Sequence, residues 1–212
     1  ARRFAAEGAE VIVNDLDPDA AQAVASEIGG LAVPGDAANE DDTRNLIDTA
    51  WAELGGVDLF CANAGVLTGG DESTPDDVWT RDWNVNVMSH VYVTRALLPR
   101  WLDQGEPKRL VITVSAAGLL SLLGSAPYAV TKHAAFSFAE WLRATYADRG
   151  VVVQALCPQG VRTPMLDSAG DVGQALMGAT AISADEAAAA VVRALDGDEF
   201  LILPLPEVGD WY

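Results

Sequence analysis

Short apolar runs alternate with amphipathic segments along nearly the whole chain, and this alternation limits the possible folds more than any other feature. Continuous apolar runs bounded by turn residues suit strands that are covered on both faces, as in parallel sheets. The expected strands are 11–13, 31–33, 57–61, 109–114, 151–156 and 200–203, and the expected helices are 17–28, 39–51, 79–101, 126–146 and 184–195. The sequence therefore predicts an α/β fold with a single doubly wound parallel sheet, a Rossmann-like arrangement.

The 212 residues fit one domain, 1–212, and no linker, repeat or charge run divides them. The chain opens on the segment from Ala1 to Gly8, which has the pattern of the last turns of a helix closed by a glycine. We therefore expect a domain truncated at its N-terminus, without its first strand, which would lie between 11–14 and 57–61 and whose loss would expose two strand edges. Because the chain stops soon after the last expected strand, we expect truncation at the C-terminus too.

The charge balance excludes several classes of partner. The chain carries 31 acidic against 13 basic residues, a formal net charge of -18, so nucleic acid and anionic membranes would be repelled.

No apolar run approaches the ~18 residues of a membrane helix and no signal peptide pattern occurs, which favours a cytoplasmic location. Cys61 and Cys157 lie too far apart for a metal-binding pair, so we expect two reduced core cysteines and no metal site.

Polar and small residues follow each expected strand. In open parallel sheets, ligands bind at the carboxyl ends of the strands. These ends include Asn14-Asp15, Gly35-Asp36-Ala37, Asn63-Ala64-Gly65, Ser115 and Pro158-Gln159-Gly160. Such residues contact a polar ligand through short side chains or a closely approaching backbone. The sequence thus predicts a polar ligand site along one edge of the sheet.

Tyr128 and Lys132 lie four residues apart in an expected helix, and therefore on one face of it. A cation near a phenol stabilises the phenolate and brings its pKa, near 10 in water, toward the range of acid/base catalysis. Ser115 ends an earlier strand, where its hydroxyl would face the same crevice. The residues alone leave two plainer interpretations open: a surface Tyr–Lys pair, and a turn or helix-cap serine.

Asn86 lies within an expected helix, between Val85 and Val87. An asparagine in mid-helix usually weakens the helix and faces solvent. The flanking valines instead indicate a partly buried amide, which needs hydrogen-bond partners.

Together these residues resemble the short-chain dehydrogenase/reductase family, and the resemblance spans nearly the whole chain. The family's catalytic serine, tyrosine and lysine and its assisting asparagine fall on Ser115, Tyr128, Lys132 and Asn86, and its Asn-Ala-Gly motif falls on Asn63-Ala64-Gly65. Its Pro-Gly turn with the following valine and threonine corresponds to Pro158, Val161 and Thr163. Here Gln159 takes the place of the glycine, with Gly160 one position later, a departure from the family pattern at the turn expected to contact nicotinamide.

The resemblance implies hydride transfer between NAD(H) and a carbonyl/secondary-alcohol pair. Tyr128 would be the general acid/base, and Ser115 would hydrogen-bond the reacting oxygen. Lys132 would lower the pKa of Tyr128 and bind the nicotinamide ribose. Asn86 would help to hold a water chain from Lys132 to solvent.

Asp15 decides the expected cofactor, because a carboxylate at this strand end accepts hydrogen bonds from the adenosine ribose 2′-hydroxyl. A 2′-phosphate would be repelled there, so NAD is favoured over NADP. Asp36 and Ala37 correspond to the family's adenine-contacting pair. The family's Gly-rich phosphate turn has no counterpart before Val11, so we expect weak NAD binding and poor solubility if the 212 residues are the whole protein.

The expected substrate is a small hydrophobic alcohol or ketone, covered by a lid at 165–181 and facing an apolar wall. That wall would consist of Leu119, Leu120, Leu122 and Leu123, although core or interface packing explains these leucines equally well. By family resemblance we expect a homodimer or homotetramer packed through helices 126–146 and 79–101. Helix 126–146 carries more aromatic residues than one face packed on the sheet needs: Phe136, Phe138 and Trp141.

Two other function classes fit the predicted fold. A non-catalytic nucleotide sensor or scaffold is compatible with it, because fold does not fix function. A sensor has no need of the full Ser115, Tyr128 and Lys132 set. A methyltransferase would also require an early Gly-rich loop and has no use for a Tyr–Lys pair.

Overall fold

The computed structural model describes residues 1–167 and 177–211, and its strands are all parallel. Four strands form a ladder in the order β3-β4-β5-β6, and β1 pairs with β2. Their bounds are β1 Ile12–Val13, β2 Leu31–Ala32, β3 Leu59–Ala62, β4 Lys108–Thr113, β5 Val151–Leu156 and β6 Leu201–Ile202. The predicted parallel α/β class is confirmed. Within the described residues the strands fall into two groups, because no ladder joins β1 to β3.

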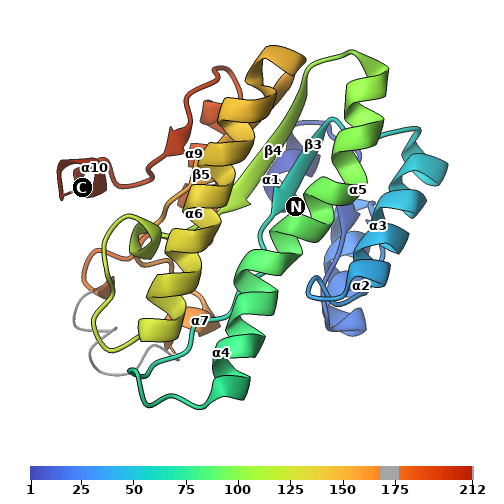
Figure 1. Cartoon of the computed structure of the whole chain (residues 1–212). Helices are drawn as coiled ribbons and strands as arrows, with labels where there is room; N and C mark the ends of the chain where they lie inside the picture. The colour runs from blue at the N-terminus through green and yellow to red at the C-terminus, as the bar shows by residue number, and fades with distance from the viewer. Residues whose placement is uncertain (168–176, 212) are drawn as a thin grey trace.

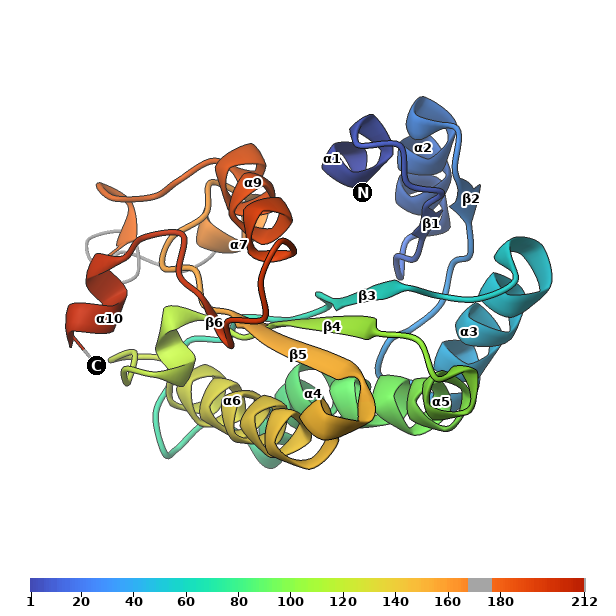
Figure 2. The same ribbon diagram turned by 90° about the horizontal axis from the view of Figure 1, so that it is seen from above.

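Helices cover both faces of the sheet (Figures 1 and 2). Helices α3, α4, α5 and α6 lie on one face, and α1, α2, α7 and α9 lie on the other (Figure 2). Their bounds are α1 Arg2–Ala6, α2 Pro18–Ile28, α3 Glu40–Leu54, α4 Asp76–Trp83, α5 Ser89–Gln104, α6 Ala126–Tyr146, α7 Pro164–Asp167, α9 Ala184–Ala194 and α10 Glu207–Trp211. In the part of the chain that the structure describes, no helix is both long and apolar enough to cross a membrane.

Local capping explains where the first helices begin and end. The Asp17 carboxylate accepts N–H bonds from the first turn of α2, Pro18 stands at its first position, and Gly29 ends it in the left-handed conformation. Asn39 caps α3 in the same way, and Gly55 ends that helix with φ +77°. The predicted helix end near the start of the chain is confirmed, since Gly8, at φ +91°, follows α1.

The predicted continuous helix 79–101 differs from the observed one. Helix α4 already begins at Asp76, and a π-helical turn, Asn84–Met88, separates it from α5. A π-helical turn inserts an extra residue into the helical repeat and is frequent at functional sites. Asn86 lies inside this turn and is fully buried. The periodicity of the apolar residues gives no sign of the irregularity.

The core lies mainly between the sheet and helices α5 and α6, where Leu97, Trp101, Ile112 and Leu142 are almost fully buried. A smaller cluster on the opposite face includes Val111, beneath α9. The prediction of two core cysteines is half wrong: Cys157 is buried, but Cys61 is exposed. Cys61 alternates with Phe60 and Ala62, which pack into the main core, so its side chain points to the other face of β3.

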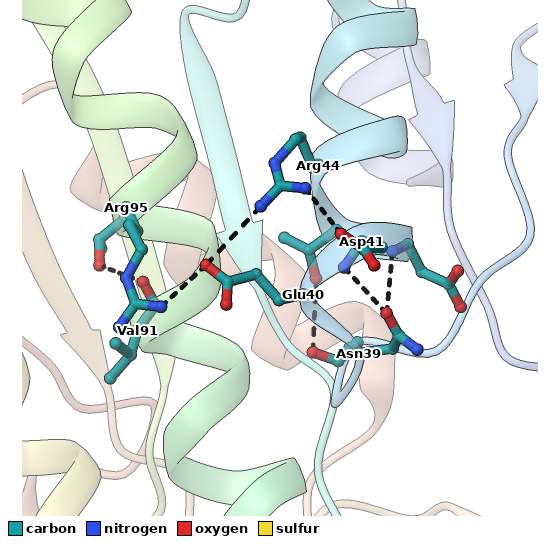
Figure 3. A network of polar contacts seen from close by, with 10 residues as sticks. Asn39, Glu40, Asp41, Arg44, Val91 and Arg95 are labelled. Atoms are coloured by element: carbon teal, nitrogen blue, oxygen red, sulfur yellow. Dashed lines mark hydrogen bonds and ion pairs between the residues drawn. The ribbon is translucent and has the colours of Figure 1, made fainter.

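A group of charged side chains links α3 to α5 (Figure 3). Arg95 on α5 donates to the Glu40 carboxylate at 2.8 Å, and Arg44 pairs with Asp41 at 2.6 Å on α3 itself. These side chains are largely exposed, so each ion pair contributes at most about 1 kcal/mol. These ion pairs therefore link α3 to α5 but contribute little to the stability of the fold.

Gly118 lies where the turn after β4 packs closely against helix α6. It closes a 3₁₀ turn, Ala116–Gly118, directly after Ser115. A Cβ atom on Gly118 would lie 2.4 Å from Val114 Cγ1 and 2.7 Å from the backbone oxygen of Lys132. A side chain at this position would therefore push the Ser115 turn away from the helix that carries Tyr128.

We expect Gly118→Ala to destabilise the protein by about 1 to 3 kcal/mol, because the added methyl group has no room against a helix backbone. Urea unfolding followed by circular dichroism measures this. Gly197→Ala is the matched control, since a Cβ at Gly197 would meet nothing within 4 Å. Equal unfolding midpoints for the two variants would contradict the expected close packing.

Candidate active site

Ser115 lies where β4 ends, next to the end of β5. Its Oγ atom accepts the Ala117 N–H at 3.1 Å, so the hydroxyl is fixed at the start of the 3₁₀ turn. The next residue, Ala116, donates its N–H to the Pro158 carbonyl at 2.7 Å. The turn after β4 is thereby tied to the turn after β5, as the parallel order of the strands requires.

Tyr128 and Lys132 lie in the first two turns of α6, both nearly fully buried. The Lys132 Nζ atom is 5.7 Å from the centre of the Tyr128 ring and donates a hydrogen bond to the Thr113 carbonyl at 3.0 Å. That carbonyl belongs to the last residue of β4. Tyr128 and Lys132 therefore face the strand end that carries Ser115, and the interpretation as a surface pair is wrong.

Burial controls the ionisation of this pair. It raises the pKa of the Tyr128 phenol, and an interaction with the Ser115 side chain only partly opposes this shift. Burial lowers the pKa of Lys132 to about 8, while the nearby Cys157 thiol acts in the opposite direction. Desolvation therefore dominates the pKa of the phenol, and the expected effect of Lys132 on it stays a prediction. At neutral pH the phenol is protonated.

Asn86 holds the loop that follows β3. Its Oδ1 atom accepts the Val66 N–H at 2.9 Å, and its Nδ2 donates to the Val66 carbonyl and to Thr131 Oγ1, both at 3.0 Å. A Cβ atom on Gly65 would lie 3.3 Å from Asn86 Oδ1 and 3.3 Å from Lys132 Nζ. Asn86 is therefore buried and fully partnered, as predicted, and it lies beside the lysine. Only a glycine leaves these two groups unobstructed.

The rest of the Asn-Ala-Gly motif lies at the same strand ends. Asn63 and Ala64 are exposed. The Asn63 Oδ1 atom accepts a hydrogen bond from Thr113 Oγ1 at 3.1 Å. Thr113 thus contacts Asn63 with its side chain and Lys132 with its carbonyl, which places the motif against the buried lysine.

Two further contacts fix the same loop, and the sequence reasoning missed both. Thr68 donates its hydroxyl to the fully buried Asp82 carboxylate at 3.1 Å, and Arg81 donates to Thr68 at 2.6 Å. Gly70 exchanges backbone hydrogen bonds with Gly124 and Ala126, two residues before Tyr128. The loop therefore joins α4 to the start of α6. In the sequence, Asp82 could have been noticed as an acidic residue four positions before Asn86.

Asp15 and Asp36 form a second group, at the ends of β1 and β2. The exposed Asp15 carboxylate accepts the Asp17 N–H at 3.0 Å, and its backbone oxygen accepts the Gly35 N–H at 3.0 Å. Asp36 accepts the Ala38 N–H at 2.8 Å, and Ala37 lies beside it. Among the described residues, no hydrogen bond connects this group to Ser115, Tyr128 or Lys132.

The turn after β5 is pinned to the segment that precedes α9. Val161 pairs with Ile182, and the Thr163 hydroxyl donates to the Val161 carbonyl at 3.2 Å. Gln159 accepts a hydrogen bond from Thr180 at 2.8 Å, so its side chain is used within the protein. A hollow of about 500 Å³ beside this turn is lined by Arg162, Thr163, Pro164, Leu166, Asp167 and Gly178. The predicted lid, 165–181, lies partly outside the described residues.

The leucines expected to form an apolar wall after Ser115 differ in their exposure to solvent. Leu119 is buried and Leu120 is partly buried, and both belong to the main core. Leu123 is 75% exposed. Core packing therefore explains the first two leucines, and only the later part of this segment is free to face a ligand.

Comparison with known proteins gives a consistent result. The family model described as short chain dehydrogenase matches residues 1–172. A 1-deoxy-11-beta-hydroxypentalenate dehydrogenase from Streptomyces exfoliatus is 36% identical over 208 residues, which cover 94% of this chain and 75% of that protein. A 3beta-hydroxysteroid dehydrogenase 2 from Eggerthella lenta is 30% identical over 172 residues, which cover 76% of this chain and 65% of that protein.

A solved structure matches nearly the whole chain. It is a short chain dehydrogenase/reductase from Burkholderia phymatum in complex with NAD, with 26% sequence identity and a TM-score of 0.89. The match covers 99% of this chain and 84% of that chain. The two parallel strand groups of this chain therefore have their counterparts in a Rossmann-like fold.

Proposed function

We propose that this chain, which belongs to the short-chain dehydrogenase family, transfers a hydride between NAD(H) and a secondary alcohol or the corresponding ketone. The observation that carries the proposal is the convergence of Ser115, Tyr128 and Lys132 on the end of β4. The phenol and the ammonium are both buried there, one helical turn apart. A residue set with this geometry exchanges a proton with an oxygen atom placed between Ser115 and Tyr128.

The residues at the strand ends fit a nicotinamide dinucleotide. Gly65 leaves the Lys132 ammonium and the Asn86 amide unobstructed, and among the described residues Lys132 uses one of its three N–H groups. Lys132 would hold the nicotinamide ribose, with Asn63 and Ala64 beside it. At the turn after β5, Pro158, Val161 and Thr163 would contact the nicotinamide, and the Gln159 side chain there is held by Thr180. The cofactor, when bound, supplies the hydride.

In this proposal Tyr128 exchanges the proton that accompanies the hydride. Burial raises the pKa of its phenol, so at neutral pH Tyr128 is a proton donor suited to ketone reduction. Alcohol oxidation needs the phenolate and would therefore accelerate as the pH rises. Ser115 would donate a hydrogen bond to the same oxygen. The positive charge of Lys132 stabilises the phenolate as it forms, and Asn86, beside Lys132, would hold the water chain toward solvent.

The names of two relatives support a substrate that carries a hydroxyl group. A hydroxypentalenate dehydrogenase and a hydroxysteroid dehydrogenase are named for such compounds. The exposed Leu123 and the buried Leu166 of the hollow beside Thr163 offer apolar surface for one. We therefore propose a small hydrophobic alcohol or ketone as the substrate.

An exposed aromatic surface on α6 supports the expected homodimer or homotetramer. Trp141 is 55% exposed and stacks on Phe138, and Trp83 on α4 is 43% exposed. Large aromatic side chains exposed on neighbouring helices favour burial against a second copy. Phe136, by contrast, packs on Phe200 within the fold.

We expect Tyr128→Phe to reduce NADH-dependent ketone reduction about 100-fold or more, because the proton donor is removed while the ring is kept. A screen of hydrophobic ketones with NADH, followed at 340 nm, identifies the substrate and measures the rate. Tyr92→Phe on α5 is the matched control and should keep the wild-type rate. Full activity of Tyr128→Phe would refute the assignment, and NADH binding without any turnover would favour a nucleotide sensor.

Cofactor choice should depend on Asp15. Its exposed carboxylate would accept hydrogen bonds from the adenosine ribose and repel a 2′-phosphate, with Asp36 and Ala37 nearer the adenine. We expect Asp15→Ala to lower the preference for NADH over NADPH, measured as the ratio of kcat/KM values, by about tenfold or more. Asp19→Ala, which removes an acidic residue of the first turn of α2, should leave the ratio unchanged. An unchanged ratio in Asp15→Ala would rule out this role.

A further inference from the structure

His90 is a buried histidine close to the candidate site, and the proposed reaction gives it no role. It is the second residue of α5, 1% exposed, and follows Asn86 by one helical turn. Residues four positions apart lie on the same face of a helix. The imidazole therefore lies on the face of the helix that carries the Asn86 amide.

The contacts of Ser89 favour one tautomer of His90. The Ser89 hydroxyl donates its only proton to the Val85 carbonyl at 2.6 Å. Toward His90 Nδ1, 3.5 Å away, the Ser89 oxygen can therefore only accept. Nδ1 then carries the proton and Nε2 carries the lone pair. Within the described residues, Nε2 is buried without a hydrogen-bond partner.

A buried acceptor of this kind calls for a donor, and the Lys132 ammonium lies near Asn86, one helical turn before His90. Asn86 Oδ1 and Lys132 Nζ both lie 3.3 Å from the position that a Cβ on Gly65 would take. Lys132 donates one N–H to the Thr113 carbonyl and has two more. The positive charge of Lys132 acts on the imidazole, because it adds to burial in lowering the pKa of His90 to about 3. At working pH His90 is neutral.

We propose that His90 is a positioning residue for Lys132, whose ammonium donates a hydrogen bond to one bound water that in turn donates to Nε2. This contact orients the ammonium and stabilises its charged form. The inference rests on the proposed function for its catalytic meaning, since a charged Lys132 stabilises the Tyr128 phenolate. The contact itself does not depend on catalysis.

The other titratable groups facing Lys132 do not supply the same acceptor. Tyr128 lies on the same helix, and its phenol is protonated at neutral pH. Cys157, at the end of β5, also faces the lysine, but burial raises the pKa of its thiol to about 11. Both groups are neutral at working pH, and a thiol is a weak acceptor. His90 therefore has the strongest free acceptor atom among them.

The small number of lysines makes the test direct. The chain has only Lys108 and Lys132, so protein labelled with ¹³C at lysine Cε gives two NMR signals, and Lys108→Arg assigns them. Titration of the Lys132 signal reports its protonation without cofactor or turnover. His90→Leu should lower the titration midpoint by about one pH unit, because a charged hydrogen-bond donor loses its acceptor.

His90→Gln provides the matched variant, because its terminal amide places a hydrogen-bond acceptor near the position of Nε2. It should restore most of the midpoint that His90→Leu loses, whereas a purely space-filling role predicts the same midpoint for both variants. In active protein, His90→Leu should also shift to higher pH the point at which the rate of alcohol oxidation rises. A smaller fraction of Lys132 is then charged, so the Tyr128 phenolate is stabilised less. An unchanged Lys132 midpoint in His90→Leu would overturn the proposal even if the enzyme is active.

The wild-type protein gives a second test that needs no variant to fold. With only His90 and His133 in the chain, ¹⁵N-histidine labelling resolves both imidazoles. We expect His90 to be neutral, with Nδ1 protonated and Nε2 carrying the lone pair between pH 6 and 9, roughly the range over which Lys132 titrates. A protonated Nε2 would overturn the proposal, because it could not accept a hydrogen bond. Lack of turnover in the ketone screen would count against the proposed function alone.

Discussion

The buried ammonium of Lys132 is the interaction around which the site is arranged. Removing a lysine from water costs several kcal/mol unless its charge is met by polar partners. Here the Thr113 carbonyl at the end of β4 meets it at 3.0 Å, and Asn86 lies close to it across Gly65. Burial nonetheless lowers the pKa of Lys132 to about 8. The amine is therefore close to losing its proton, and small changes around it affect its charge.

Close backbone packing is what brings the other groups to this lysine. Gly118 lets the turn after Ser115 lie against the backbone of Lys132, and Gly65 lets the loop after β3 approach its Nζ atom. The loop continues to Gly70, which is bonded to the residues that start α6. Gly65 and Gly118 thus set the distances between the loop after β3, the turn after β4 and helix α6, which are far apart in the sequence. A side chain at either position would separate groups that must act together.

Much of this arrangement could be predicted from the sequence, because the signals were local. Apolar runs between caps such as Asp17 and Asn39 defined the strands and helices, and the four-residue spacing of Tyr128 and Lys132 placed them on one helix face. Burial of Asn86 followed from its valine neighbours. Contacts between distant residues left little signal beyond such hints as the position of Asp82 four residues before Asn86. The Asp82–Thr68 hydrogen bond and the exposure of Cys61 depend on how elements meet in three dimensions. The depth of burial, which raises the Tyr128 pKa, has no local signal in the sequence either.

Substitution of Lys132 by methionine tests the central claim most directly, because methionine keeps an unbranched side chain only one atom shorter and removes the charge. The measurement is the rate of NADH-dependent ketone reduction at neutral pH, together with NADH affinity by fluorescence titration. The account predicts a rate lower by about 100-fold or more and weaker NADH binding, since one side chain supports both. A Lys132→Met protein with wild-type rate and affinity would contradict it.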